Sequence, residues 1–212
     1  QPHAAEHAQV DRGENKHEPE CQPHPQRHPN QRHPVTPSDQ DSGNALAAQA
    51  DTVISARRFA GPAMVAVSPV TLKPRFNAVA TGPEPPPPPA ALPPQVDQRQ
   101  ATLFAAGWTL GSIVSLACGG ADLATYFETT GWRGVIELDE GCELPARFRS
   151  TPGCAFPIYH LYADLAAIAG EVIRPVACDP HAQIVGFGRF GPDGVSLWLA
   201  NLSRQSQTIE LP

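Results

Sequence analysis

The sequence has little of what would indicate a nucleic-acid-binding protein, a disulfide-stabilised domain or a zinc-binding domain. Lysine and arginine together number 15, against 21 acidic residues, which gives a formal net charge of −6. A protein that neutralises phosphates needs clustered basic side chains, so this charge argues against DNA or RNA as a partner. The five cysteines are odd in number, and none belongs to a CxxC pair. We therefore expect scattered, reduced cysteines and no metal site.

The sequence also lacks a recognisable signal peptide, because no basic segment followed by an apolar one opens it. One uncharged stretch, residues 101–120, is long enough to be tested as a membrane span. Its threonines, serines and glycines dilute the hydropathy, and neither aromatic nor basic anchors flank it. We expect a buried helix here, no membrane partner and a cytoplasmic protein.

Residues 1–42 show no apolar periodicity and hold six of the eight histidines among repeated glutamine, proline and arginine. Such a segment buries too little apolar surface to offset the entropy of ordering. Three interpretations are open: a disordered tail, a histidine tract that binds a divalent metal, or DNA read in a shifted frame. We favour the third, because GC-rich DNA read out of frame yields these residue types, and we expect no function from this segment.

From Asn44 onward, patterns typical of helices alternate with short apolar runs typical of strands. This alternation predicts an α/β fold built from βαβ units with a parallel sheet. The predicted elements are a helix at 44–59, a strand at 63–70, a proline-rich connection at 71–97, a helix at 98–118, a strand at 121–127, a loop at 128–153 and a helix at 155–170.

The connections between these elements differ in length. Both strand-to-helix connections exceed about 25 residues, whereas the helix-to-strand return is little more than Gly119-Gly120. In parallel α/β proteins the chemistry sits on the loops that leave the carboxyl ends of the strands. The asymmetry therefore predicts an active face at that edge. Because a closed barrel needs eight strands, we expect these two to be a portion of a larger architecture.

From Glu171 the apolar pattern changes to one typical of strands. Residues 182–190 and 195–203 flank the turn "GPDG", and residues 207–211, "QTIEL", follow. The pattern predicts a β-hairpin and one further strand, which together begin an antiparallel β module.

The first group of candidate site residues follows the second predicted strand, in the run "ETTGWRG". Glu128 comes directly after the apolar part of the strand, and Thr129, Thr130, Trp132 and Arg133 follow it. A carboxylate serves as a general base toward water, a guanidinium stabilises an oxyanion, and an indole packs against a sugar ring. The alternative, which stays open here, is that Glu128 and Arg133 only pair with each other.

The first predicted strand ends in a second polar group, in the run "SPVTLKPRFN". Its members are Ser68, Thr71, Lys73, Arg75 and Asn77. Ser68 lacks the GxSxG turn of a hydrolase nucleophile, so we expect a polar contact and not a nucleophile. Arg75 and Asn77 fit substrate contacts or loop anchors equally well, and we interpret His160 as a packed or surface residue.

Several of these motifs together resemble the C-terminal portion of the D-apionate lactonases. The motifs are "VSPVTLKPRFN", "ATGPEPPPPPAALPPQVDQRQ", "FAAGWTLGSIVSL", "YFETTGWRGVIE", "FPIYHLYADLA" and "LWLANLS". Members of that family are bacterial proteins of D-apiose catabolism with a glycosidase-like (β/α)8 barrel followed by a β-sandwich. The resemblance extends from about Asn44 to Pro212.

The resemblance implies hydrolysis of a sugar-acid lactone, D-apionolactone, to D-apionate, in the cytoplasm and without a cofactor. It makes the two predicted strands the seventh and eighth of the barrel, with Ser68–Asn77 and Glu128–Arg133 at its mouth. The expected organisation is a tail at 1–42, a partial barrel at 43–170 and a partial β-sandwich at 171–212. Since the family's barrel is longer, we expect a truncated homologue that is inactive by itself.

Two other functions stay open. A retaining glycoside hydrolase of the same barrel type needs a second carboxylate about 5 Å from the first. The other acidic residues near the two clusters are Glu84 in the proline-rich connection and Glu137, Asp139 and Glu140 in a loop expected to be exposed. The second alternative is a non-catalytic fragment.

Overall fold

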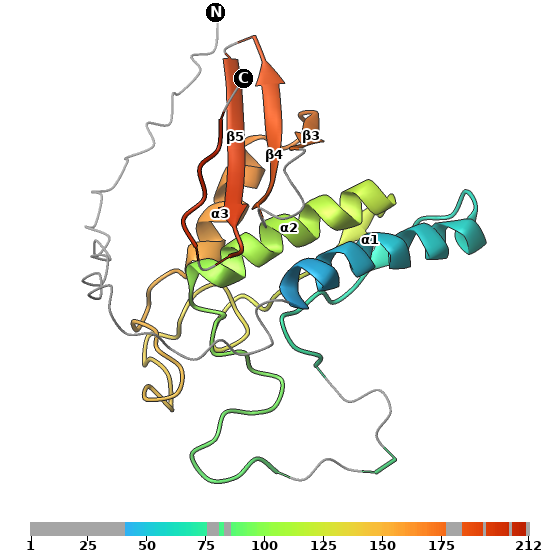
Figure 1. Cartoon of the computed structure of the whole chain (residues 1–212). Coiled ribbons are helices and arrows are strands. Elements are labelled where there is room, and N and C mark those ends of the chain that lie inside the picture. Colours follow the sequence, from blue (N-terminus) through green and yellow to red (C-terminus); the bar gives the residue numbers. More distant parts are fainter. Residues whose placement is uncertain are drawn as a thin grey trace, which may run out of the picture. The chain divides into compact units, whose positions relative to one another are not determined.

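The computed structural model describes residues 41–75, 81–82, 86–176, 184–192, 194–203 and 205–210, with only the backbone at 41–44. Its elements are α1 (Asp41–Ala60), β1 (Ala66–Val67), α2 (Leu103–Gly119), β2 (Leu123–Ala124), α3 (Pro157–Ala167), β3 (Ile173–Pro175), β4 (Ile184–Gly191) and β5 (Gly194–Asn201) (Figure 1). Helices and strands alternate as far as α3, as expected of an α/β chain. Of the predicted tail, only residues 41–42 are described, and they begin α1.

The strands β1 and β2 form a parallel pair, which confirms the predicted parallel sheet. The pairing extends past the strands, since the amide of Val70 donates to the Thr125 carbonyl at 2.8 Å. Both strands are shorter than predicted. Pro69 has no amide hydrogen to donate, so the regular ladder stops before it.

The helix α2 begins at Leu103, five residues later than the prediction of Gln98. Before it, the Asp97 carboxylate accepts a hydrogen bond from the Arg99 amide at 2.9 Å and holds residues 97–102 in turns. The helix ends where Gly120 takes a left-handed conformation with φ of +90°. This position explains the glycine pair that the sequence places there.

A row of glycines on α2 allows its neighbours to approach closely. The row consists of Gly107, Gly111 and Gly119. A methyl group on Gly119 would lie 2.8 Å from the carbonyl oxygen of Ala50 in α1, and one on Gly107 would lie 3.1 Å from Cβ of Ala200 in β5. The glycines that dilute the hydropathy of this helix therefore allow it to pack against both α1 and the antiparallel sheet.

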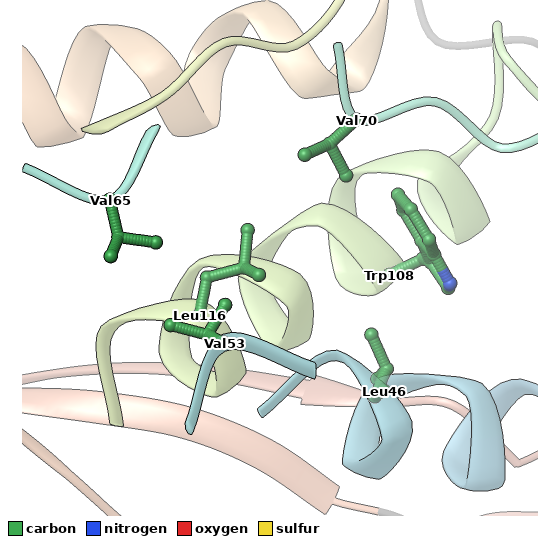
Figure 2. Packing of buried hydrophobic residues seen from close by; sticks show 6 residues of the cluster. All are labelled: Leu46, Val53, Val65, Val70, Trp108 and Leu116. Atoms are coloured by element: carbon green, nitrogen blue, oxygen red, sulfur yellow. The ribbon is translucent and has the colours of Figure 1, made fainter. Parts of the chain in front are cut away.

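Three clusters of buried apolar side chains form the core. The first, shown in Figure 2, joins α1, α2 and the β1 region and consists of Leu46, Val53, Val65, Val70, Trp108 and Leu116. The second lies beneath the long loops and consists of Val96, Phe148, Phe156 and Ile158. The third joins α2, α3 and β4 through Leu110, Leu161 and Phe187. The uncharged stretch is thus a buried helix, and no helix among the described residues is long and apolar enough to cross a membrane.

The strands β3, β4 and β5 form an antiparallel sheet in that order. The hairpin β4–β5 closes through the pair Gly191 and Gly194, which confirms the predicted turn. The further strand predicted at 207–211 is wrong, because residues 207–210 are not a strand. After β5 the side chain of Asn201 bonds to the Ser203 amide and the Gln205 carbonyl, which turns the chain. The third strand is β3, whose three residues are too few to give a visible alternation.

One expectation about the cysteines is also wrong. Cys118 and Cys142 are free, as expected, but Cys154 is disulfide-bonded. A disulfide depends on how closely two cysteines approach in space, which their spacing along the chain does not reveal.

The close approach of α1 and α2 yields a prediction. Gly119→Ala places a methyl group 2.8 Å from the Ala50 carbonyl oxygen and 2.9 Å from Cβ of Val53. We expect the free energy of unfolding to fall by about 1–3 kcal/mol, because overpacking against backbone outweighs the helix propensity of alanine. Urea unfolding followed by circular dichroism measures the change. Gly82→Ala, where the methyl group meets no atom within 4 Å, is the control; an equal or greater stability of Gly119→Ala would contradict the prediction.

Candidate functional site

The candidate site lies at the edge of the sheet where β1 and β2 both end. Because the two strands are parallel, the loops that follow them leave from the same edge. Glu128 in the second loop pairs with Arg133, with Oε1 and Nη2 2.9 Å apart, and with Arg75 of the first loop, with Oε1 and Nη1 3.3 Å apart. The pairing that the sequence left open is therefore present, and a second arginine joins it.

The loop that carries Glu128 and Arg133 is closed by its own backbone. The Glu128 amide donates to the Arg133 carbonyl at 3.0 Å, and two later amides donate to the Thr129 carbonyl. Gly134 lies so close to Thr130 that a methyl group there would be 2.5 Å from the Thr130 carbonyl carbon. Only glycine fits at this position, and the loop therefore fixes the spacing of Glu128 and Arg133.

Two buried polar side chains anchor the same loop, and no sequence pattern indicates either role. Gln100 is 3% exposed, and its amide nitrogen donates to the Gly134 carbonyl at 2.9 Å. Glu137 is 1% exposed, accepts a hydrogen bond from the Leu138 amide at 2.9 Å, and accepts another from the Ser150 hydroxyl. The expectation of an exposed Glu137 is thus wrong, because its carboxylate satisfies donors inside the loop.

A pocket of about 390 Å³ opens beside the ion-paired cluster. Its lining includes Glu128, Thr130, Trp132, Arg133, Pro93 and Glu143. The structure thus brings together four of the predicted site residues. It adds Glu143, a second carboxylate that the sequence analysis did not single out, since nothing in its neighbourhood suggests a strand end.

A cavity of about 10 Å³ adjoins Trp132 and Arg133 and is also lined by Thr71 and Arg75. This is roughly the space of one water molecule and too small for a sugar. Nε of Arg75 is buried and has no hydrogen-bond partner among the described residues. Thr71 donates its hydroxyl to the Lys73 carbonyl at 2.6 Å.

Three of the other candidate residues, Ser68, Thr129 and His160, line neither cavity. The Ser68 hydroxyl is exposed and hydrogen-bonded to that of Thr125. Thr129 is exposed and contributes its carbonyl to the loop. Asn77 and Glu84 lie outside the described residues. His160 is exposed and meets the ring of Tyr159 edge to face.

Asp97 is a buried carboxylate that lines the small cavity together with Arg75 and Arg133. Its carboxylate is 4% exposed and pairs with Arg99 at 2.7 Å. Burial by itself would raise the pKa of Asp97, but the hydrogen bonds from Arg99 and the charges of Arg99 and Lys73 outweigh it and hold the pKa below its ordinary value. Asp97 is therefore ionised at neutral pH and keeps the start of α2 in place beside the cluster.

A larger pocket, of about 680 Å³, lies between α2, α3 and β5. It contains none of the predicted site residues. In its lining, the Trp198 indole donates to the Asp164 carboxylate at 3.1 Å. Among the described residues, no group of three or more His, Cys, Asp or Glu side chains is arranged to hold a metal ion.

Comparison with known families now bears on the candidate site. Residues 43–170 match the family model described as D-apionate lactonase, TIM barrel domain. The match covers more than half of the chain. This chain belongs to the D-apionate lactonase family. The resemblance inferred from the motifs is thereby confirmed, and every candidate site residue lies within the matched segment. No curated protein and no solved structure matches the chain.

The anchoring role of Asp97 yields a second prediction. Its folded-state pKa lies below the ordinary aspartate value of 3.8, so ionised Asp97 stabilises the fold above that pH, and the contribution is lost as the pH falls through the folded pKa. Asp97→Asn should lower the free energy of unfolding by about 1–3 kcal/mol at neutral pH, and less as the medium becomes acidic.

Urea unfolding at several pH values between about 7 and 3 measures this difference. Asp51→Asn, on the exposed side of α1, is the matched control and should leave the profile unchanged. A difference between wild type and Asp97→Asn that stays constant down to the lowest pH would contradict the prediction.

Proposed function

We propose that the chain supplies part of the active site of a carbohydrate-lactone hydrolase, with D-apionolactone as substrate and D-apionate as product. The observation that carries the proposal is the position of Glu128, which lines a pocket with Arg133, Thr130 and Trp132 at the carboxyl end of a parallel strand. Membership of the family supports the same reaction. In parallel α/β folds this edge of the sheet is where substrates bind.

Each residue has a chemical role in this proposal. Glu128 takes a proton from a water molecule, whose oxygen adds to the lactone carbonyl carbon. Arg133 stabilises the oxyanion that forms, and the ring carbon–oxygen bond then breaks as the proton passes to the leaving alkoxide. Trp132 packs against the carbon skeleton and Thr130 binds a hydroxyl group. The step consumes one water, yields one carboxylic acid and needs no cofactor.

Other parts of the proposal concern the architecture. We interpret β1 and β2 as the seventh and eighth strands of the barrel and the β3–β5 sheet as part of a β-sandwich. A complete barrel has eight strands, and the described residues contain one parallel pair. On this interpretation, the remaining strands of the barrel supply the other face of the pocket. Five further residues contact the substrate or orient the residues that contact it: Ser68, Thr71, Arg75, Asn77 and Thr129.

The proposal predicts that Glu128→Gln removes hydrolysis without unfolding the protein. We expect kcat for D-apionolactone to fall by about 100-fold or more, because the amide cannot accept the proton. The assay measures acid release at constant pH in a complete family barrel whose corresponding segment is replaced by residues 43–170. Glu140→Gln, an exposed acid of the same loop, is the matched control. Retention of most of the activity by Glu128→Gln, with circular dichroism unchanged, would refute the role of Glu128.

Glu143 supports a second candidate, a glycoside hydrolase, because it gives the pocket a second carboxylate. In that enzyme one carboxylate protonates the leaving oxygen and the other attacks or activates water. Glu143→Gln should then abolish release of nitrophenol from aryl glycosides by the same barrel. If the lactonase proposal holds, this variant instead keeps its lactone hydrolysis within about threefold, and the wild type releases no nitrophenol.

A further inference from the structure

We propose that the 390 Å³ pocket beside Glu128 binds the carboxylate of an open-chain sugar acid in preference to a neutral polyol. In the complex, the ligand's carboxylate replaces that of Glu128 on the guanidinium groups of Arg133 and Arg75. The inference deepens the proposed function and rests on it for the class of ligand. Its consequence is that the pocket holds the anionic product of lactone opening more tightly than uncharged molecules of the same skeleton.

The first argument is the supply of donors around Glu128. Two guanidinium groups carry ten N–H donors, and both make their shortest contact to the same oxygen, Oε1 of Glu128. One carboxylate cannot use all these donors. The cluster therefore has donor capacity for a second carboxylate.

The second argument is that the existing ion pairs are easily exchanged. The side chains of Glu128 and Arg133 are 36% and 38% exposed. Ion pairs at such exposure contribute little to stability, because water screens them. An incoming carboxylate that binds the planar guanidinium through two parallel hydrogen bonds can therefore replace Glu128.

The third argument concerns the balance of charge. Around the cluster, Arg75, Arg133 and Lys73 oppose Glu128, while the charge of Asp97 is already paired with Arg99. Glu143 also lines the pocket, but it is exposed to solvent, which weakens its repulsion of an anion. The local charge at the guanidinium groups is thus positive.

The fourth argument is the shape and lining of the pocket. Its volume of about 390 Å³ suits a small sugar acid. Trp132 offers an apolar wall for the carbon skeleton, and Thr130 offers a hydroxyl for the ligand's own hydroxyl groups. Because Arg133 lines the same space, the skeleton can rest on the indole while the carboxylate contacts the guanidinium.

Isothermal titration calorimetry on the full chain tests the inference with two ligands of one skeleton, sodium D-erythronate and erythritol. We expect erythronate to bind about 10-fold more tightly than erythritol, and the difference to shrink at about 0.5 M NaCl. Equal affinities, or no measurable erythronate binding, would overturn the proposal.

Variants then identify the groups that bind the anion. Arg133→Gln should weaken erythronate binding by about 10-fold, and Arg133→Lys by less, because lysine keeps the charge but not the planar pair of donors. Glu128→Gln should tighten erythronate binding by about threefold or more, since it removes the competing carboxylate. Arg58→Gln, which removes an exposed arginine of α1, is the control for net charge. Weaker erythronate binding in Glu128→Gln would also overturn the proposal.

These results are separable from those that test the lactonase proposal. Preferential erythronate binding without lactone hydrolysis leaves a sugar-acid site and removes the proposed catalytic function. Lactone hydrolysis without a preference for erythronate removes the anion site alone. Glu128→Gln makes the distinction sharpest, because the same substitution should abolish hydrolysis and strengthen binding of the anion.

Discussion

The parallel pairing of β1 with β2 is the constraint on which the candidate site depends. Each strand is short, yet their pairing directs two loops, distant in sequence, to one edge of the sheet. Arg75 leaves from one strand and Glu128 from the other, so their ion pair exists only because the strands run side by side in the same direction. A shift in this pairing would separate the arginine from the carboxylate.

Close packing of α2 against its neighbours stabilises the part of the fold that carries the candidate site. Its row of glycines brings α1 and the antiparallel sheet within contact distance, and its apolar residues contribute to the first and third core clusters. The residues just before the helix contribute to the site more directly, because Gln100 holds the Gly134 carbonyl and Asp97 caps the turn. One continuous stretch, residues 97–119, thus both packs the core and positions the loop that carries Glu128.

The cluster of Glu128 with two arginines reconciles the two interpretations that the sequence left open. An ion pair at a strand end is a structural feature, but an exposed pair beside a pocket is also a pair that a ligand can enter. In lactone hydrolysis the substrate is neutral and the product is an anion. On our proposal, the guanidinium group that stabilises the oxyanion also attracts the carboxylate that the reaction forms, and Glu128 competes with that product for the same donors.

The sequence by itself determined the features that depend on neighbouring residues. Alternating apolar patterns predicted the helices and the parallel strands, "GPDG" predicted the hairpin turn, and the end of an apolar run marked Glu128. The motifs also sufficed to indicate the family. Helix and strand ends were less accurate, because side-chain caps and prolines such as Pro69 decide them locally.

Only the tertiary structure decided which distant residues meet. The contact of Arg75 with Glu128, the bond from Gln100 to Gly134, the burial of Glu137 and the presence of Glu143 in the pocket all depend on the path of two long loops. No periodicity encodes that path, since loop residues point wherever the backbone turns them. The sequence therefore identified the carboxylate and both arginines, and the fold brought the three together and added the anchors around them.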